Sequence, residues 1–251
     1  MEVIQLPVLT DNYIYILICD DVVACVEPTV AEPVTDYLFD HGLGLDYILS
    51  THHHWDHIGG NEDLKDRWGC KIIGAANDSA RIPGIDIKLR NNDEFTIGAS
   101  KFRVLEIPGH TIGHIAYYFP EDKKVFLGDT VFAMGCGKLF EGTPRQMMSS
   151  INKIKNLPPD TKMYCAHEYT KKNAEFALTV DPSNSKLQNR YKDVCAKRLK
   201  HIPTVPSFIS EELDTNPFLR VDNKEIQKTI NCLDKPAEDV FLKLRQMKDS
   251  F

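Results

Sequence analysis

The sequence contains no apolar run long enough to cross a membrane and no pair of cysteines at CxxC spacing. A transmembrane helix needs about 18 to 20 consecutive apolar residues, and no segment of this chain reaches that length. The seven cysteines lie far apart, at positions 19, 25, 70, 136, 165, 195 and 232. An odd, scattered set of this kind indicates buried free thiols in a reducing compartment. We therefore expect no membrane partner and no disulfide framework.

The N-terminus and the charge exclude further classes. MEVIQLPVLTDNYIYILICDD has no basic region before its apolar residues, so a cleaved secretory signal is not expected. We expect a cytoplasmic protein, with a removed organelle-targeting extension as the alternative. A formal net charge of -6 argues against nucleic acid as the main partner. Residues 171–251 nevertheless hold 15 Lys and Arg against 12 Asp and Glu, which suits a small anionic substrate, although solvated helix faces explain this excess equally well.

The order of elements predicts an α/β protein of two domains. Short β-branched or apolar runs bounded by turn residues predict two blocks of strands interleaved with helices, and such blocks indicate two sheets face to face with helices outside. After about Lys171 helical spacing takes over, so we divide the chain into domains 1–170 and 171–251. The expected strands are 3–9, 13–19, 22–26, 47–50 and 71–74, followed by 95–97, 102–107, 114–119, 124–127 and 162–166.

Local motifs predict where helices begin and where the chain is irregular. Side chains that accept hydrogen bonds from a helix's first turn are expected to cap four helices. Pro236 is expected to start the last helix. Residues 81–90, which include Pro83 and Gly84, are expected to form an exposed loop. The four expected caps are Thr29, Asn61, Thr143 and Ser183.

The run Thr51–His57, THHHWDH, is the most informative stretch of the chain. In extended backbone His52, His54 and Asp56 would point the same way, and His57 would follow a turn into a helix. Neutral imidazoles and carboxylates are ligands for zinc, iron and manganese. These four ligands exceed what one catalytic metal takes from one segment, so we expect a second metal. A surface histidine cluster is disfavoured, because the run follows an apolar strand and contains Trp55.

Three more candidate ligands follow glycines or apolar strands. His110 lies in PGHTIGH, Asp129 follows VFLG, and His167 follows MYCA. Each alone is equally well explained as a structural residue. Together with the histidine run they supply seven ligands, enough for two metal ions that share one carboxylate.

Four motifs in this order, THHHWDH, PGHTIGH, GDTVF and CAHEYT, resemble the metallo-β-lactamase superfamily. The GCGK loop at 135–138, NPFLR at 216–220 and the helical tail are similar to the glyoxalase II family, the hydroxyacylglutathione hydrolases. The resemblance implies an αββα metallo-β-lactamase sandwich with a C-terminal α-helical domain. It implies two divalent ions, zinc, iron or manganese, with one held by His52, His54 and His110, the other by Asp56, His57 and His167, and Asp129 bridging both.

The resemblance also implies the reaction. A metal-bridging hydroxide, oriented by Asp56, would hydrolyse the thioester S-D-lactoylglutathione to D-lactate and glutathione, the second step of methylglyoxal detoxification. Such enzymes are expected to be monomers. The implied substrate contacts are Lys138, Tyr169, Arg245 and Lys248. Phe140 stands where the family usually has a tyrosine, so one hydrogen bond to the substrate would be missing.

Alternative functions fit the sequence less well. A mononuclear iron glutathione-persulfide dioxygenase of the same superfamily is disfavoured by the full ligand set and the long helical tail. A metallo-nuclease is disfavoured by the acidic first domain. A non-catalytic protein that kept the fold is disfavoured because all seven candidate ligands are present. His53 and His114 are expected to support the site rather than bind metal. With an activated water available, neither Cys136 nor Cys165 is needed as a nucleophile.

Overall fold

The computed structural model describes all 251 residues and contains two compact units. The first unit comprises residues 1–106 and 112–128, and the second comprises residues 107–111 and 129–251. The division into domains 1–170 and 171–251 stays a prediction. None of the helices combines the length and the apolar character that a membrane-spanning segment requires.

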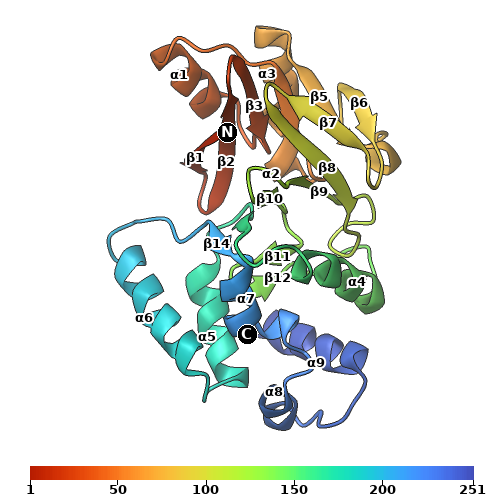
Figure 1. Cartoon of the computed structure of the whole chain (residues 1–251), viewed down its shortest axis with the longest axis vertical. Coiled ribbons are helices and arrows are strands. Elements are labelled where there is room, and N and C mark those ends of the chain that lie inside the picture. Colours follow the sequence, from red (N-terminus) through yellow and green to blue (C-terminus); the bar gives the residue numbers. More distant parts are fainter. The chain divides into compact units, whose positions relative to one another are not determined.

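The first unit is built on a six-stranded sheet in the order β1-β2-β3-β4-β5-β6 (Figure 1). β1 to β3 pair antiparallel, and β3 to β6 pair parallel. Parallel neighbours need a crossover connection, which α1 (Glu32–Asp40) provides between β3 and β4 and α3 (Asn61–Trp68) provides between β4 and β5, whereas η1 (Ala76–Asp78) lies between β5 and β6. The strands are β1 (Glu2–Val8), β2 (Asn12–Cys19), β3 (Val22–Val26), β4 (Tyr47–Leu49), β5 (Lys71–Ala75) and β6 (Ile85–Leu89).

A second, antiparallel set of strands packs against this sheet within the same unit. The Tyr117 hydroxyl donates a hydrogen bond to the Ser50 carbonyl at 2.7 Å and lies 3.1 Å from the Ile73 carbonyl. The rings of Tyr15 and Phe126 meet edge to face at 5.5 Å. The predicted face-to-face sheets are therefore confirmed here. The strands of this set are β7 (Glu94–Ile97), β8 (Ser100–Glu106), β9 (Ile115–Phe119) and β10 (Lys124–Phe126).

Helices α1 and α3 cover the other face of the first sheet. Leu38 of α1 and Leu64 of α3 belong to one buried apolar cluster with Ile16, Cys25 and Ile48 of the sheet. The near-continuous apolar run of β2 is buried along almost its whole length, as expected for a strand that is covered on both faces. The unit thus has three layers, helices, sheet and sheet.

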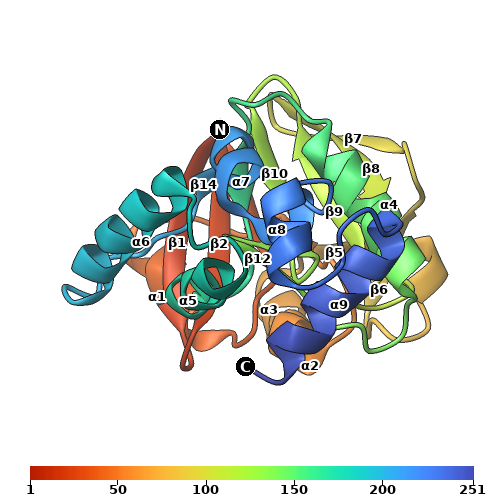
Figure 2. The same ribbon diagram turned by 90° about the horizontal axis from the view of Figure 1, so that it is seen from below.

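The second unit is mostly helical. Helices α5 and α6 pack side by side through Ala174, Ala177, Leu187 and Val194 (Figure 2). The elements are β11 (Val131–Phe132), β12 (Gly135–Cys136), α4 (Pro144–Lys155), β13 (Lys162–Tyr164), α5 (Thr170–Val180), α6 (Ser185–Arg198), β14 (Ser207–Phe208), α7 (Ile209–Thr215), η2 (Pro217–Leu219), α8 (Lys224–Thr229) and α9 (Ala237–Asp249).

Buried polar side chains fix the β11–β12 hairpin in this unit. The Asn216 amide donates to the carbonyls of Phe132 at 3.1 Å and Gly135 at 3.0 Å. Glu212, which is fully buried, accepts the Met134 N–H at 2.7 Å and pairs with Arg190 at 2.6 Å. Because each of these buried polar groups finds a partner, their desolvation cost is offset, and the loop that follows the hairpin starts from a fixed position.

Two of the predicted caps are wrong because their side chains bond elsewhere. Helix α1 has no side-chain cap, since the Thr29 hydroxyl donates to the Asp56 carbonyl at 2.6 Å. Asn61 lies inside α3 rather than before it, and its buried amide donates to the Ser50 hydroxyl at 3.0 Å. The predicted capping box at Thr143 is confirmed.

Two further predictions need correction. The cap of α6 is Asn184, not Ser183. Within the expected loop 81–90, residues Ile85–Leu89 form strand β6, because the alternating IDIKL pattern can pair with β5 at the edge of the sheet. Pro83 and Gly84 mark only the turn that precedes this strand.

Replacing Tyr117 with phenylalanine should lower the free energy of unfolding by ~1 kcal/mol. The Ile73 carbonyl keeps the N–H of Ser50, whereas the Ser50 carbonyl loses the hydroxyl. Burial raises the pKa of Tyr117 well above its ordinary value, so this loss should not depend on pH near neutrality. Urea unfolding of Tyr117→Phe beside Tyr37→Phe, a tyrosine outside this contact, measures the difference. Equal stability of the two variants would contradict the predicted role.

Candidate metal centre

Four predicted ligands lie in the first unit, directly beyond β4. His52 and His54 lie in the segment between β4 and α2 (Trp55–Ile58), and His54 is the N-cap of α2 with φ −60° and ψ 140°. Asp56 and His57 therefore lie in the first turn of a helix, so the extended backbone predicted through Asp56 ends at His54. His52 and His57 are buried, whereas Asp56 keeps some exposure.

The donor atoms of this run lie at the spacing that two ligands of one metal adopt. His52 Nε2 is 3.1 Å from His54 Nδ1, and His57 Nε2 is 3.4 Å from Asp56 Oδ2. Two ligands at 2.0–2.1 Å from a tetrahedral zinc ion are about 3.3–3.4 Å apart. The residues present therefore fit a divalent metal in both chemistry and spacing.

The other three predicted ligands lie in the second unit and also converge. Asp129 Oδ2 is 3.4 Å from His110 Nε2, and Asp129 Oδ1 is 3.4 Å from His167 Nε2. All three side chains are at least nine-tenths buried. Because each carboxylate oxygen faces a different imidazole, Asp129 has the geometry of a carboxylate that can bind two ions at once.

Glu27 is a functional candidate that the sequence analysis missed. It follows β3 with φ +55° and is 2% exposed. Its Oε1 lies 2.9 Å from His57 Nδ1 and accepts the hydroxyl of Thr51. Metal-binding histidines commonly donate their second N–H to a carboxylate, which fixes the tautomer and the ring orientation. The missed signal is a glutamate directly after the buried strand VVACV, the same kind of position that identified Asp129.

Other groups hold the remaining ligands in place. Asn12 donates from Nδ2 to Asp56 Oδ2 at 3.2 Å. In the second unit, His110 Nδ1 is 2.9 Å from the Lys138 carbonyl, so this nitrogen carries the proton and Nε2 is left as the ligand atom. The ring of Tyr169 stacks on His167 with centroids 4.7 Å apart. Asp56, His110 and His167 are thus each oriented by a group that is not itself a predicted ligand.

Two glycines let the backbone pass close to the ligands. A Cβ on Gly128, which has φ +48°, would come 2.3 Å from the Thr51 hydroxyl. A Cβ on Gly137 would come 1.9 Å from the Asp129 carbonyl. Neither approach leaves room for a side chain, so the GD and GCGK motifs need glycine at these positions.

The remaining histidines have structural partners. His53 Nδ1 lies 3.0 Å from Asp78 Oδ2, and His114 stacks on His52 with centroids 4.5 Å apart. Burial raises the pKa of the Cys136 thiol to about 11 and raises that of Cys165 further. A thiol must ionise to act as a nucleophile, so these values agree with the expectation that neither cysteine attacks the substrate.

A pocket of about 380 Å³ opens beside Asp129 and His110 in the second unit. All five predicted substrate residues line it. Lys172 and Asn173 of α5 also line it, and the sequence analysis did not select them. The predicted substrate residues in its wall are Lys138, Phe140, Tyr169, Arg245 and Lys248.

The two cations of α9 differ in how they meet this pocket. Arg245 is 4% exposed and donates to the Cys136 carbonyl at 2.7 Å and to Asp249 at 3.0–3.1 Å. The Lys248 ammonium group donates to the Lys172 carbonyl at 3.2 Å. Burial, assisted by the positive charges of Arg245 and Lys172, lowers the pKa of Lys248 to about 8.

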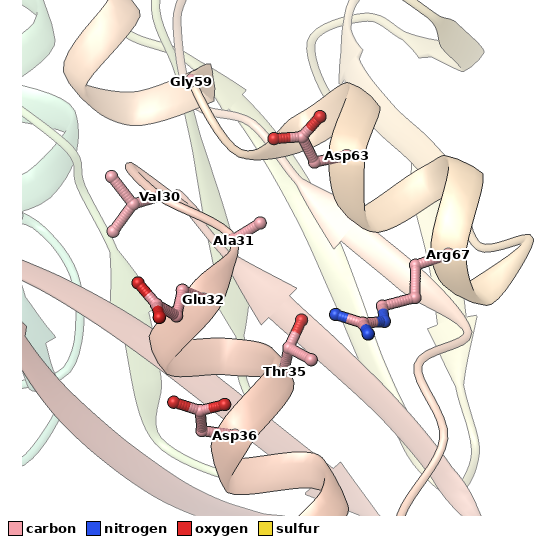
Figure 3. Close-up of a pocket in the computed structure, with 8 residues that line it drawn as sticks. All are labelled: Val30, Ala31, Glu32, Thr35, Asp36, Gly59, Asp63 and Arg67. Carbon is pink, nitrogen blue, oxygen red and sulfur yellow. The ribbon is translucent and has the colours of Figure 1, made fainter.

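A larger cavity, of about 530 Å³, lies between α1 and α3 in the first unit (Figure 3). Glu32 and Asp36 line it from α1, and Asp63 and Arg67 line it from α3. No imidazole or thiol contributes to its wall. A transition-metal centre prefers such ligands, so this cavity is not the candidate centre despite its size.

Comparisons with known proteins identify the family of this chain. Residues 28–167 match the family described as "Metallo-beta-lactamase superfamily", and residues 168–251 match "Hydroxyacylglutathione hydrolase C-terminus". The chain is 47% identical over 253 residues to a hydroxyacylglutathione hydrolase of Methylococcus capsulatus, covering 100% of this chain and 99% of the relative. It is 49% identical over 254 residues to one of Synechococcus sp. (strain JA-3-3Ab), covering 100% of both.

Solved structures share the fold. The BLEG-1 B3 metallo-beta-lactamase has a TM-score of 0.66 and 25% identity, covering 87% of this chain and 99% of its own. ETHE1 from Myxococcus xanthus has a TM-score of 0.68 and 23% identity, covering 96% and 95%. These matches confirm the predicted fold class, a metallo-β-lactamase sandwich with a C-terminal helical region. With full-length relatives well above 30% identity, the chain belongs to the hydroxyacylglutathione hydrolase family of the metallo-β-lactamase superfamily.

Proposed function

We propose that this chain hydrolyses the thioester S-D-lactoylglutathione to D-lactate and glutathione, the second step of methylglyoxal detoxification. One observation carries the proposal: Asp129, with its two oxygens facing His110 and His167, lies in the wall of a pocket that four cationic side chains also line. Metal ligands beside a cationic pocket suit hydrolysis of an anionic substrate. The full-length similarity to hydroxyacylglutathione hydrolases supports the same reaction.

Family membership and the imidazole and carboxylate clusters support divalent-metal binding. The proposal is more specific and assigns two ions to seven side chains. Zinc is the first choice, and iron or manganese also suits ligands that are all nitrogen or oxygen. Bound metals would supply Lewis acidity, which lowers the pKa of water from 15.7 to about 7. In this assignment His52, His54 and His110 would hold one ion, Asp56, His57 and His167 would hold the other, and Asp129 would serve both.

The protein's own side chains would orient the reacting groups. Asn12 and Thr29 hold Asp56 at its side chain and at its carbonyl, so its carboxylate is positioned to accept a hydrogen bond from the attacking water. A preorganised carboxylate of this kind needs no rearrangement when the reaction begins. The leaving group is a thiolate, whose conjugate acid has a pKa of about 8.5. Departure of such a group needs little help from a proton donor.

The pocket in the second unit would bind the glutathione part of the substrate. Its lysines and Arg245 suit the two carboxylates of glutathione, and Tyr169 supplies a hydroxyl. Phe140 is 64% exposed and its ring meets His110 edge to face at 5.1 Å, so it can contact the substrate only through apolar atoms. We also expect a monomer in the cytoplasm, and size-exclusion chromatography tests the assembly state.

Incubation with S-D-lactoylglutathione should release free thiol at a rate that depends on bound metal. Removing the metal with a chelator should reduce hydrolysis to the uncatalysed rate, and adding zinc, iron or manganese should restore it. Metal analysis of the same preparation should find two ions per chain. A metal-free sample that keeps full activity would contradict the mechanism, and oxygen uptake with glutathione persulfide would favour the dioxygenase instead.

Replacing Glu27 with glutamine should weaken metal binding by about 10- to 100-fold. Glutamine keeps the size of the side chain but removes the charge that faces His57 Nδ1. Competition with a chromophoric chelator measures the affinity, and circular dichroism checks the fold. Glu62→Gln, on the exposed face of α3, is the matched control. Equal affinities in the two variants would show that Glu27 does not act through the metal ligands.

Replacing Phe140 with tyrosine should lower KM for the thioester. A new hydrogen bond contributes about 0.5–1.5 kcal/mol, which corresponds to a decrease of roughly 2- to 12-fold. Steady-state kinetics beside Phe208→Tyr, an aromatic residue outside the pocket, test this expectation. An unchanged KM would mean that no substrate acceptor lies within reach of this position.

A further inference from the structure

The cavity of about 530 Å³ between α1 and α3 has a charged wall that the proposed reaction does not use. Figure 3 shows the four charged side chains on facing helices, Glu32 and Asp36 on α1 and Asp63 and Arg67 on α3. None of these side chains forms a hydrogen bond or an ion pair. The Arg67 guanidinium instead lies 5.2 Å from the centre of the Phe39 ring. The charges of this wall are therefore open to a ligand.

The position of Arg67 is informative, because a closer partner lies on its own helix. An Asp and an Arg four residues apart on a helix commonly pair, yet Asp63 and Arg67 form no ion pair. Figure 3 shows the guanidinium extended from α3 toward α1 and away from Asp63. The two opposite charges thus stand apart within one cavity, where each can meet a different group of one ligand.

Thr35 distinguishes this cavity from an ordinary acidic surface. The residue is 4% exposed. Its N–H donates to the Ala31 carbonyl at 3.0 Å, whereas its hydroxyl takes part in no hydrogen bond. Figure 3 shows this hydroxyl directed away from α1, into the space between the helices. A buried hydroxyl without a partner costs free energy, and a ligand group that bonds it would remove that cost.

The composition of the wall limits the class of ligand. Three carboxylates outnumber one guanidinium, so a ligand with more positive than negative charge complements the wall. None of the three carboxylates belongs to a group of side chains close enough to share one metal ion, which disfavours a divalent cation. No aromatic ring is present on which a nucleobase could stack. The apolar part of the wall is small, Val30 and Ala31, and suits an aliphatic chain.

We propose that this cavity binds a free dibasic amino acid such as lysine. The α-carboxylate would accept hydrogen bonds from the Arg67 guanidinium and the Thr35 hydroxyl, the two donors that face it. The α-ammonium group would contact Asp63, one helical turn from Arg67, and the side-chain ammonium group would contact Glu32 and Asp36. The aliphatic chain between the two ammonium groups would cover the apolar part of the wall. This inference does not depend on the proposed reaction.

Titration of the isotope-labelled, metal-loaded protein with L-lysine, followed by NMR, tests the proposal. The backbone amide signals of residues 30–36 and 59–67 should shift, with a dissociation constant of about 1 mM or lower for a ligand of this size. No shift at lysine concentrations up to about 10 mM, a free energy of binding below 3 kcal/mol by order of magnitude, would overturn the proposal. Shifts confined to other segments would overturn it as well.

Single substitutions in the wall should weaken lysine binding. Arg67→Gln, Asp63→Asn and Thr35→Val should each raise the dissociation constant about three- to tenfold, a range that allows for solvent screening. Asp66→Asn, on α3 but outside the wall, is the matched control and should bind lysine like the wild type. Equal weakening by this control would show a general charge effect and overturn the site.

Thr35→Val gives a second readout that does not involve a ligand. Because the hydroxyl has no partner in the free protein, valine should leave the free energy of unfolding unchanged or raise it. Urea unfolding of the free protein measures this quantity. A clear loss of stability would mean that the hydroxyl has a structural role, and its assignment to a ligand would fail.

Related ligands separate the individual contacts. Cadaverine lacks the carboxylate, so it should bind the wild type more weakly than lysine and should gain affinity in Arg67→Gln, where a repelling charge is gone. Nα-acetyl-L-lysine lacks the α-ammonium charge, so Asp63→Asn should cause it no further loss. Loss of cadaverine binding in Arg67→Gln would contradict the carboxylate contact. Magnesium chloride that shifts the same signals at lower concentration than lysine would identify a metal site and overturn the proposal.

Discussion

The carboxylate of Asp129, buried with its two oxygens 3.4 Å from the Nε2 atoms of His110 and His167, is the contact on which the site in the second unit depends. A buried carboxylate beside two imidazoles is costly unless a charge compensates it. A divalent metal bound there would supply that charge. A separate, steric constraint acts at Gly137, where a Cβ would meet the Asp129 backbone carbonyl.

In the first unit, hydrogen-bond partners orient the predicted metal ligands. The Nδ1 atoms of His52 and His57 face Thr51 and Glu27, and the buried carboxylate of Glu27 is the central partner. Glu27 contacts His57 and Thr51, and Thr51 lies against His52. These contacts connect the end of β3 to the segment Thr51–His57. The orientation of its histidines therefore depends on the packing of the sheet and not on the local sequence alone.

The cations that line the pocket in the second unit differ in their hydrogen-bond partners. Arg245 donates to the Cys136 carbonyl and pairs with Asp249, whereas Lys248 donates to the Lys172 carbonyl. A buried guanidinium whose donors already have partners holds the neighbouring backbone in place and adds positive charge to the pocket wall. The more flexible lysine ammonium groups at the pocket wall can contact a ligand. Burial, and then the positive charges of Arg245 and Lys172, lower the pKa of Lys248.

Residue type and spacing alone predicted the face-to-face sheets, most strands and the candidate metal ligands, because period-two apolar runs and seven imidazole and carboxylate side chains are local properties of the sequence. The resemblance to a known family, rather than spacing, selected the five predicted substrate residues, all of which line the pocket. Only tertiary structure decided the roles of Glu27, Thr29, Asn61 and Lys172, whose partners lie 11 to 76 positions away in the chain. The sequence does not distinguish a polar side chain that caps a helix from one that bonds a distant group. Only the packing of the folded chain selects between these partners.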